Sequence, residues 1–491
     1  MPLAPQPSLF QVRRSAGVAI LTLFILSVGL CGLGTLPPAQ TAAALLVIWI
    51  SAFPIFVYLQ GWVAPSIPVI PFAGLYYLCF FALPVFFGPW AYHYQDKVLL
   101  YGRVPLDLIG WDTLLLVAAG IGCLWIGYYA SRRFIGRVPS FRIFQSTAAP
   151  GHLTILYLVL LVASLSFRYS EFLRQLPSIG QFLDPAGYLA LGGLFLQWRR
   201  NELSTCYAAT IAIVVLPLEL NWRLRHAMLT DLLMLVVFFA FIFWREKYYR
   251  VIAFLAVCGV ACLLVYSAAH LVREATASAY QQSINISKAF VDTWTRDHRI
   301  EGTSSNGLPI SWDARFSPLL NRVSQIWLFQ SVYERTPDPV PYWGGETYRP
   351  LLTALIPRAI YPDKPLERAG WDFGRRYDLL SSSDNRTSVN IPWLTELFVN
   401  FGPFGVIAGM AIFGLLLAVL DKIFNKASAN DLTYLIGLTV IFRLGYQESN
   451  FSVMTGSLPQ LFACFCGYFW FGQFALRYLY GKVMVLRDVC R

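Results

Sequence analysis

Charged residues are scarce in this chain of 491 residues: Asp, Glu, Lys and Arg together make up only 13% of it. Soluble domains carry about 25% charged residues, whereas this chain is 57% hydrophobic and 16% aromatic. The composition excludes an ordinary soluble enzyme, a disordered chain and a small disulfide scaffold. The net charge of +11 would suggest nucleic-acid binding in a soluble protein. In a membrane protein the same excess reflects basic cytoplasmic loops.

Disulfides and metal sites are not indicated either. The polar segment 271–400 contains no cysteine, and eight of the nine cysteines lie in or beside apolar runs. Cys258 and Cys262 have helical spacing inside such a run, and Cys464 and Cys466 lack the second pair that a zinc site needs. None of the five histidines has a metal-ligand spacing with another His or Cys. We therefore predict neither a metal nor a cofactor.

Long apolar runs recur along the chain. A membrane-spanning helix needs about 20 mostly apolar residues. We predict twelve spans, at 16–35, 41–59, 67–89, 112–130, 152–168, 182–198, 204–220, 227–243, 251–270, 402–420, 431–447 and 459–480. The sequence thus predicts an all-α polytopic membrane protein. We find no internal repeat of the kind that inverted-repeat transporters show.

The basic residues give this bundle an orientation. With twelve spans, most of the basic clusters fall in loops on one side, including Arg13 and Arg14, Arg132 and Arg133, and Arg199 and Arg200. The positive-inside rule makes that side the cytoplasm, so both termini are predicted to be cytoplasmic. Much of the positive charge then lies in cytoplasmic loops, where it sets the orientation of the helices, and it does not indicate nucleic-acid binding.

Four regions follow from this topology. Residues 1–270 form a bundle of about nine transmembrane helices, and residues 271–400 form a large loop or cap on the outer face. The last three transmembrane helices occupy 401–480, and 481–491 is a cytoplasmic tail. The loop mixes both signs of charge with many Trp, Tyr and Pro residues, which indicates a folded or half-folded cap because disordered segments have few aromatics.

Some basic residues lie on the outer side, where the orientation rule does not call for them. Arg223 and Arg225 share the short outer turn between the seventh and eighth spans, and Arg443 lies in the outer half of the eleventh. Guanidinium groups bind phosphate oxygens in a bidentate manner. We therefore predict that Arg223 or Arg225 contacts a lipid diphosphate headgroup, and that Arg443, inside an otherwise apolar helix, has a partner or a ligand. For Arg168, at the outer end of the fifth span, we favour an ordinary structural role, in which it either extends to the lipid headgroups or pairs with an acidic residue.

Two further motifs lie on the outer side. The proline-bounded segment 356–365 adds the cations Arg358 and Lys364, and its Tyr361 is placed to stack on a sugar. Just before the tenth span, Glu396 and Asn400 are four residues apart and so share one helical face. Glu396 is either a general base or an ion-pair partner. A second carboxylate, Glu448, lies just beyond Arg443 in the sequence. Gly402 and Gly405 permit a tight entry into the span or close helix packing.

These motifs resemble a known family. Pro357-Arg-x-x-x-Pro-x-Lys-Pro365, followed by Glu396-x-x-x-Asn-Phe-Gly-x-x-Gly405, is similar to the oligosaccharide repeat-unit polymerases, the Wzy-type O-antigen and exopolysaccharide polymerases. Many spans, a large late periplasmic loop and cytoplasmic termini add to the resemblance. The family often places a small residue on each side of an arginine in an outer hairpin. Here that turn is Trp222-Arg-Leu-Arg-His226, which departs from this pattern and leaves open whether Arg223 or Arg225 is the match.

The resemblance implies a metal-independent glycosyltransferase with a GT-C-like membrane fold in the bacterial inner membrane. It would transfer a growing glycan from undecaprenyl diphosphate to a lipid-linked repeat unit on the periplasmic face. It implies Glu396 and Arg358 as catalytic residues, Arg223, Arg225, Arg443 and Lys364 on the diphosphate, and Tyr361 and Asn400 on the glycan. A chain-length regulator and a flippase would be partners. An O-antigen ligase-like transferase and a flippase or transporter of lipid-linked sugars remain the alternatives.

Overall fold

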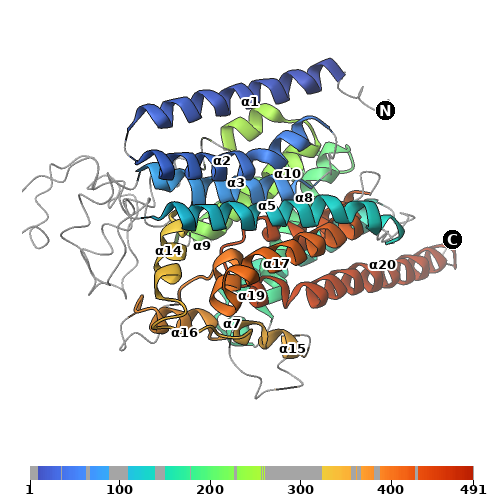
Figure 1. The fold of residues 1–491 in the computed structure, drawn as a ribbon. Helices are drawn as coiled ribbons and strands as arrows, with labels where there is room; N and C mark the ends of the chain where they lie inside the picture. The colour runs from blue at the N-terminus through green and yellow to red at the C-terminus, as the bar shows by residue number, and fades with distance from the viewer. Residues whose placement is uncertain are drawn as a thin grey trace, which may run out of the picture.

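The computed structural model describes residues 9–34, 36–61, 67–87, 109–138, 150–176, 179–225, 229–255, 257, 259, 323–354, 356, 361, 367–380, 388–425 and 430–489. Within these residues the fold is all-helical and has no strand (Figure 1). Residues 88–108, between the third and fourth predicted spans, and residues 260–322, which include the first part of the predicted cap, lie outside the described ranges.

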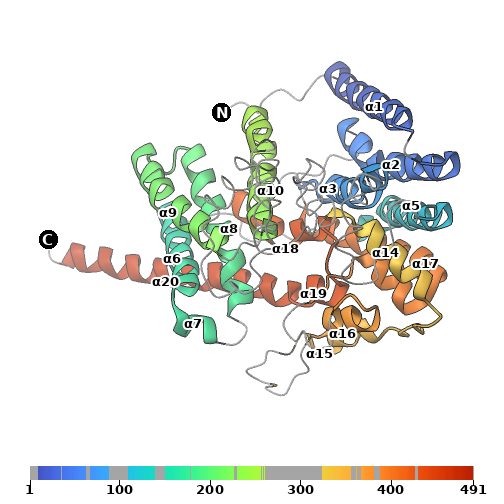
Figure 2. The same ribbon diagram turned by 90° about the vertical axis from the view of Figure 1, so that its left-hand side faces the viewer.

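The first half of the chain supplies most of the bundle. Its helices are α1 (Leu9–Gly32), α2 (Pro38–Leu59), α3 (Val69–Tyr77) with η1 (Leu78–Ala82), α5 (Trp111–Phe134), α6 (Pro150–Tyr169), α7 (Glu171–Gln175), α8 (Gly180–Arg199), α9 (Thr205–Arg225) and α10 (Leu229–Arg245). Figure 2 shows α1, α2 and α5 on one side of the bundle and α6, α8 and α9 on the other. Between these two sides, α18 and α10 occupy the middle of the view.

The second half adds short cap helices and the helices that close the bundle. These elements are α14 (Gln325–Arg335), η5 (Glu346–Tyr348), α15 (Pro350–Ala354), α16 (Ala369–Arg376), α17 (Trp393–Phe424), α18 (Asp431–Ile441), η6 (Phe442–Gly445), α19 (Phe451–Thr455) and α20 (Leu458–Val489). The described residues between 323 and 400 form short helices and turns.

Within the described ranges, five helices are long and apolar enough to cross a membrane. They are Pro38–Leu59, Val69–Phe87, Trp111–Phe134, Gly151–Tyr169 and Trp393–Phe424. Every predicted span except 251–270 coincides with a helix, and most of 251–270 lies outside the described residues. The structure does not show twelve spans, because several of these helices are too short or too polar, as α18 is with 11 residues.

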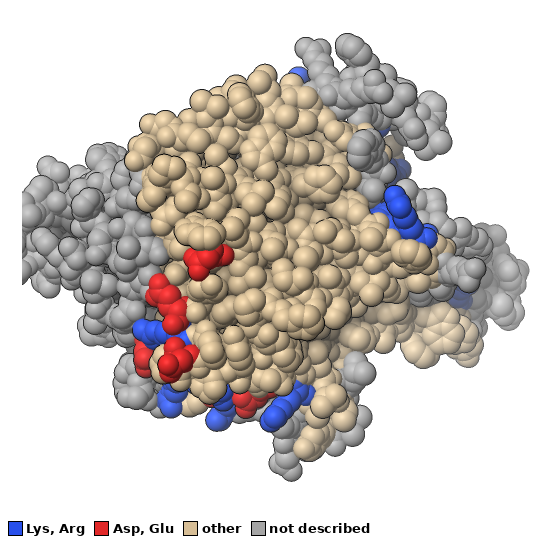
Figure 3. Space-filling view, in the orientation of Figure 1, with Lys and Arg blue, Asp and Glu red and all other residues tan. Residues whose placement is uncertain are grey.

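The distribution of charge fits a membrane protein. On the face drawn in Figure 3, the Lys, Arg, Asp and Glu side chains lie toward the left, lower and right edges of the view and leave most of the central surface uncharged. Large apolar side chains are exposed on several helices, among them Phe24, Ile126 and Ile213. An apolar belt between charged ends is the surface that lipid tails solvate.

Close packing of α5 against α17 forms the centre of one side of the bundle. A Cβ atom at Gly414 would overlap the carbonyl oxygen of Leu124, and one at Gly127 would overlap the carbonyl oxygen of Ala411. Small residues of this kind let two helix backbones approach within the bilayer, where van der Waals packing replaces the hydrophobic effect as the driving force. At the far end of the pair, the hydroxyl of Tyr128 donates to Asp421 at 2.7 Å.

We predict that Gly414→Leu destabilises the fold by separating α5 from α17. Overpacking a filled core costs about 1–3 kcal/mol, so the detergent-solubilised variant should unfold several degrees below the wild type. Gly122→Leu on α5 is the matched control, because no atom lies within 4 Å of a Cβ at Gly122. Equal melting temperatures for the two variants would contradict this packing.

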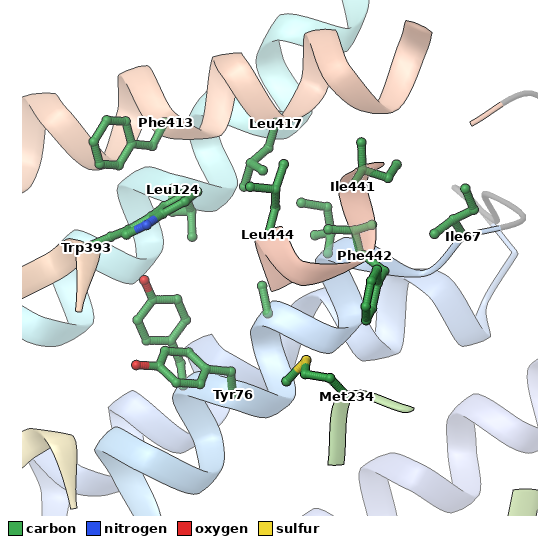
Figure 4. Packing of buried hydrophobic residues seen from close by; sticks show 14 of the residues in the cluster. Ile67, Tyr76, Leu124, Met234, Trp393, Phe413, Leu417, Ile441, Phe442 and Leu444 are labelled. Atoms are coloured by element: carbon green, nitrogen blue, oxygen red, sulfur yellow. The ribbon is translucent and has the colours of Figure 1, made fainter. Parts of the chain in front are cut away.

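α17 is two helical segments joined by a sharp turn. Gly402 has φ 67° and ψ −158°, which only glycine adopts readily, and Pro403 follows it. The ring of Trp393 lies 5.1 Å from that of Phe413, although twenty residues of straight helix would separate them by about 30 Å. Residues 393–401 therefore fold back against the spanning part of the helix, 403–424 (Figure 4). Of the two roles predicted for Gly402, a tight entry or close helix packing, this turn is the tight entry.

Candidate functional site

A polar cleft of about 450 Å³ opens where several helix ends meet. The residues around it come from α6, α8, α9, α10, α18, η6, α19, α20 and the loops between them. They are Arg168, Gly180, Gln181, Asp184, Pro185, Tyr188, Trp222, Met234, Asn390, Thr439, Val440, Arg443, Tyr446, Glu448, Ser449, Val453, Met454, Ser457, Leu458 and Leu461. This cleft is the candidate functional site.

Arg443 is the predicted diphosphate ligand that the structure places in this cleft. It lies in η6, the tight turn that ends α18, and its side chain is exposed to the cleft. The guanidinium carbon is 5.9 Å from the ring centre of Tyr188, a distance at which a cation and an aromatic face attract each other. Within the described part of the chain, no carboxylate forms an ion pair with Arg443. Its charge is therefore available to an anion in the cleft.

Arg168 has a different environment. It is buried, with 1% of its surface exposed, and it forms an ion pair with the equally buried Glu219 of α9. Its Nε lies 3.4 Å from Asp184 Oδ1 of α8. Gly187 makes room for this pair, because a Cβ there would lie 3.2 Å from Arg168 Nη2. Of the two structural roles that the sequence favoured for Arg168, the structure shows pairing with acidic residues, and this pairing links α6, α8 and α9.

We predict that Arg168→Ala destabilises the protein strongly. The substitution would leave the Glu219 carboxylate buried without its cation, which typically costs about 3–5 kcal/mol. The double variant Arg168→Met with Glu219→Leu removes both charges and should recover most of the melting temperature. Thermal unfolding of the single and double variants in one detergent measures the effect. A double variant no more stable than Arg168→Ala would contradict the pairing.

Glu448 is the cleft residue that offers acid–base chemistry. Glu448 is 2% exposed and lines the same cleft as Arg443. It follows Arg443 by five positions in the chain. The Nε2 of Gln325, in α14 of the cap, donates to its Oε1 at 3.4 Å. The sequence showed that Glu448 follows Arg443, but its place in the cleft depends on the turn made by η6. We infer that Glu448 is the better-placed carboxylate for proton transfer.

Glu396 and Asn400 share one face of the folded-back segment, as their spacing predicted, because Asn400 Nδ2 donates to the Glu396 carbonyl at 2.8 Å. The carboxylate of Glu396 accepts a hydrogen bond from the Phe451 backbone N–H at 2.7 Å. Asn400 also donates to Thr347 Oγ1 at 2.9 Å and accepts from the Gly345 N–H at 2.9 Å. Both residues are buried, and neither is among the residues that line the cleft.

Glu396 therefore supports a segment that lines the cleft, although it does not line the cleft itself. Phe451, which it holds, begins α19, and this helix contributes Val453 and Met454 to the cleft. A second carboxylate supports the same segment, because Asn450 Nδ2 donates to Glu367 Oε1 at 3.2 Å. Burial raises the pKa of Glu367 above its ordinary value. The geometry thus assigns Glu396 and Glu367 to positioning the segment that carries Glu448.

The other predicted site residues do not join the cleft in the described structure. Arg223 and Arg225 lie in the last turn of α9, one and three positions after the cleft residue Trp222, but their side chains lie outside the described residues. Arg358 and Lys364 also lie outside the described residues. Tyr361 is 39% exposed and is not among the residues that line the cleft.

Comparison with known proteins places most of this site within one family. The family described as a domain of unknown function, DUF8712, matches residues 145–449, more than half of the chain. The chain belongs to this family. No curated protein and no solved structure matches it. The part matched by DUF8712 begins shortly before α6 and contains Arg168, Arg443 and Glu448.

The two arginines in the cleft of this DUF8712 chain have different partners. Arg168 is held by two carboxylates, whereas Arg443 stacks on Tyr188. Within the described ranges, no group of three or more His, Cys, Asp or Glu residues is placed to hold a metal ion. The side chains present can therefore bind an anion through Arg443 and accept a proton through Glu448.

Proposed function

We propose that this protein is a polymerase of lipid-linked oligosaccharide repeat units in the bacterial inner membrane. The observation that carries the proposal is Arg443, a cation without a carboxylate partner among the described residues, in a polar cleft at the end of a membrane bundle. A guanidinium group that faces a polar cleft can bind the oxygens of a phosphate there in a bidentate manner. Undecaprenyl diphosphate is an anion that sits at the surface of the bilayer.

In the proposed reaction, an acceptor hydroxyl on one lipid-linked repeat unit attacks the anomeric carbon of a glycan on undecaprenyl diphosphate. A new glycosidic bond forms as the bond from that carbon to the diphosphate oxygen breaks. Arg443 stabilises the negative charge that develops on the leaving diphosphate, as fixed cations do in preorganised sites. Glu448 accepts the hydroxyl proton as general base. Undecaprenyl diphosphate is the other product.

The remaining elements of the proposal extend this centre. Twelve spans, a GT-C-like arrangement, a periplasmic cap and cytoplasmic termini would place the cleft at the periplasmic face. Arg223 and Arg225 follow Trp222 along α9 and would reach the same diphosphate. Arg358 and Lys364 would add charge from the cap, and Tyr361 would pack on a sugar. A chain-length regulator and a flippase are the partners that such a polymerase requires.

Two other functions would use the same cleft differently. A ligase would transfer a finished glycan from the carrier to another acceptor, and it needs the same arginine. A flippase or transporter would need charges along a path through the bilayer. The cluster of Arg168, Asp184, Arg443 and Glu448 in one cleft at the helix ends favours a transferase.

Deletion of the gene followed by electrophoresis of the surface glycan tests the proposal. We expect single-repeat products in place of the length ladder, restored by the wild-type gene supplied on a plasmid. Full-length polymer stranded on the carrier would indicate a ligase instead. Loss of every periplasmic product would indicate a flippase, and an unchanged ladder would refute a role in glycan assembly.

A further inference from the structure

A second cavity lies under α9. It has a volume of about 490 Å³ and is lined almost entirely by apolar side chains of α8, α9 and α10. The residues around it are Leu191, Leu194, Phe195, Trp198, Leu203, Thr205, Ala208, Ala209, Ile211, Ala212, Leu216, Leu235, Val236, Phe239, Phe243 and Leu255. The polar atoms of two lining residues, Trp198 and Thr205, bond to each other, and the remaining lining is apolar, so the chemistry of the cavity suits a hydrocarbon.

The contacts of α9 explain why this cavity exists. At one end, Glu219 pairs with Arg168, and Tyr169 Oη donates to the Leu218 carbonyl at 2.7 Å. At the other end, Trp198 Nε1 donates to Thr205 Oγ1 at 3.2 Å. Between these attachments, small residues of α9 such as Ala208 and Ala212 face the cavity. α9 is therefore fastened at both ends and stands away from α8 in its middle.

The apolar cavity continues the polar cleft along the same helices. On α8, Tyr188 lines the cleft and Leu191 lines the cavity, which places the two boundaries about one helical turn apart. On α10, Met234 lines the cleft and its neighbour Leu235 lines the cavity. A molecule with an anionic head and a long apolar chain would therefore meet Arg443 with its head and the cavity with its chain.

We propose that the cavity under α9 holds the hydrocarbon chain of the lipid diphosphate whose head lies in the cleft. This inference rests on the proposed function for the identity of the head, and it adds the site of the chain. The outer face of α9, with Ile213 73% exposed, lies toward lipid, so the chain enters sideways from the bilayer. α9 then serves as the outer wall of the chain site, and a longer chain binds more tightly because it buries more apolar surface.

Equilibrium binding of two sugar-free probes tests this proposal on the full-length protein in detergent. Geranyl diphosphate and undecaprenyl diphosphate share the head and differ in chain length. We expect the wild type to bind the long probe at least about ten-fold more tightly, since each buried methylene adds to affinity. Ala212→Phe fills the cavity and should reduce that preference to about two-fold or less. Ile213→Phe, on the lipid-facing side of the same helix, should retain the wild-type preference.

The variants separate this proposal from the function it builds on. A preference unchanged in both Ala212→Phe and Ala208→Phe, each eluting as a monodisperse species, would overturn the chain site whether or not the protein polymerises glycans. A preference lost in both, and retained in Ile213→Phe, supports the chain site even if the protein shows no polymerase activity. Binding of the uncharged polyprenol with the same chain-length preference also supports it, because the cavity contacts only the chain.

Discussion

Replacing Arg443 by alanine should lower polymerisation about a hundred-fold or more, because removal of one preorganised group that stabilises developing charge typically costs this much. The loss should appear in the rate of transfer at saturating substrate as well as in binding, since negative charge on the diphosphate grows as the glycosidic bond breaks. Transfer from a purified lipid-linked repeat unit, followed by electrophoresis of the products, measures it. Arg443→Lys should recover only part of the activity, because lysine cannot make bidentate contacts.

The matched control for this variant is Arg376→Ala. Arg376 is also a partly exposed arginine that stacks on an aromatic ring, that of Trp343 at 4.1 Å, and it lies outside the residues that line the cleft. Its ion pair with Glu346 is exposed, so its removal should cost less than about 1 kcal/mol. Equal activity in the Arg443 and Arg376 variants would show that Arg443 takes no part in the reaction.

Substitution of Glu396 distinguishes a general base from a positioning residue. Its carboxylate accepts the Phe451 N–H, and glutamine retains an oxygen that can accept the same bond. We therefore expect Glu396→Gln to keep activity within a few-fold of wild type. Glu396→Ala leaves a buried N–H unsatisfied, which costs about 1–3 kcal/mol, and should lower both activity and melting temperature. The measurements are the transfer rate and thermal unfolding of both variants.

A general base at this position would give the opposite pattern. Glutamine cannot accept a proton at neutral pH, so Glu396→Gln would then be as inactive as Glu396→Ala while keeping its melting temperature. The corresponding substitution in the cleft, Glu448→Gln, should show that behaviour, because Glu448 lines the cleft and Glu396 does not. Similar activities for Glu448→Gln and the wild type would remove Glu448 as the base.

The sequence is informative where local patterns decide the structure. Apolar runs located the helices, and the pair Gly402 and Gly405 predicted the tight entry that the positive φ of Gly402 provides. Arg443 stood out because an arginine inside an apolar helix needs a partner or a ligand. The i,i+4 spacing of Glu396 and Asn400 also predicted that they share a face.

The rest depends on contacts that no local pattern encodes. Arg168 and Glu219 are 51 residues apart in the chain, and their pairing follows from how α6 packs near α9. The hydrogen bond from Phe451 to Glu396 spans 55 residues. The sequence therefore left open whether this carboxylate is an ion-pair partner or a general base. Only the packing of α8, α9 and α10 creates the apolar cavity beside the cleft. Glu448 is a candidate only in the structure, because the turn of η6 places it in the cleft.

The most direct test of the account uses the purified protein with one lipid-linked repeat unit in detergent and no membrane gradient. The account predicts a ladder of products that lengthens with time, with release of undecaprenyl diphosphate in proportion to the bonds formed. Arg443→Ala should abolish the ladder, and Arg376→Ala should leave it intact. A wild-type protein that binds the repeat unit but forms no glycosidic bond would contradict the account.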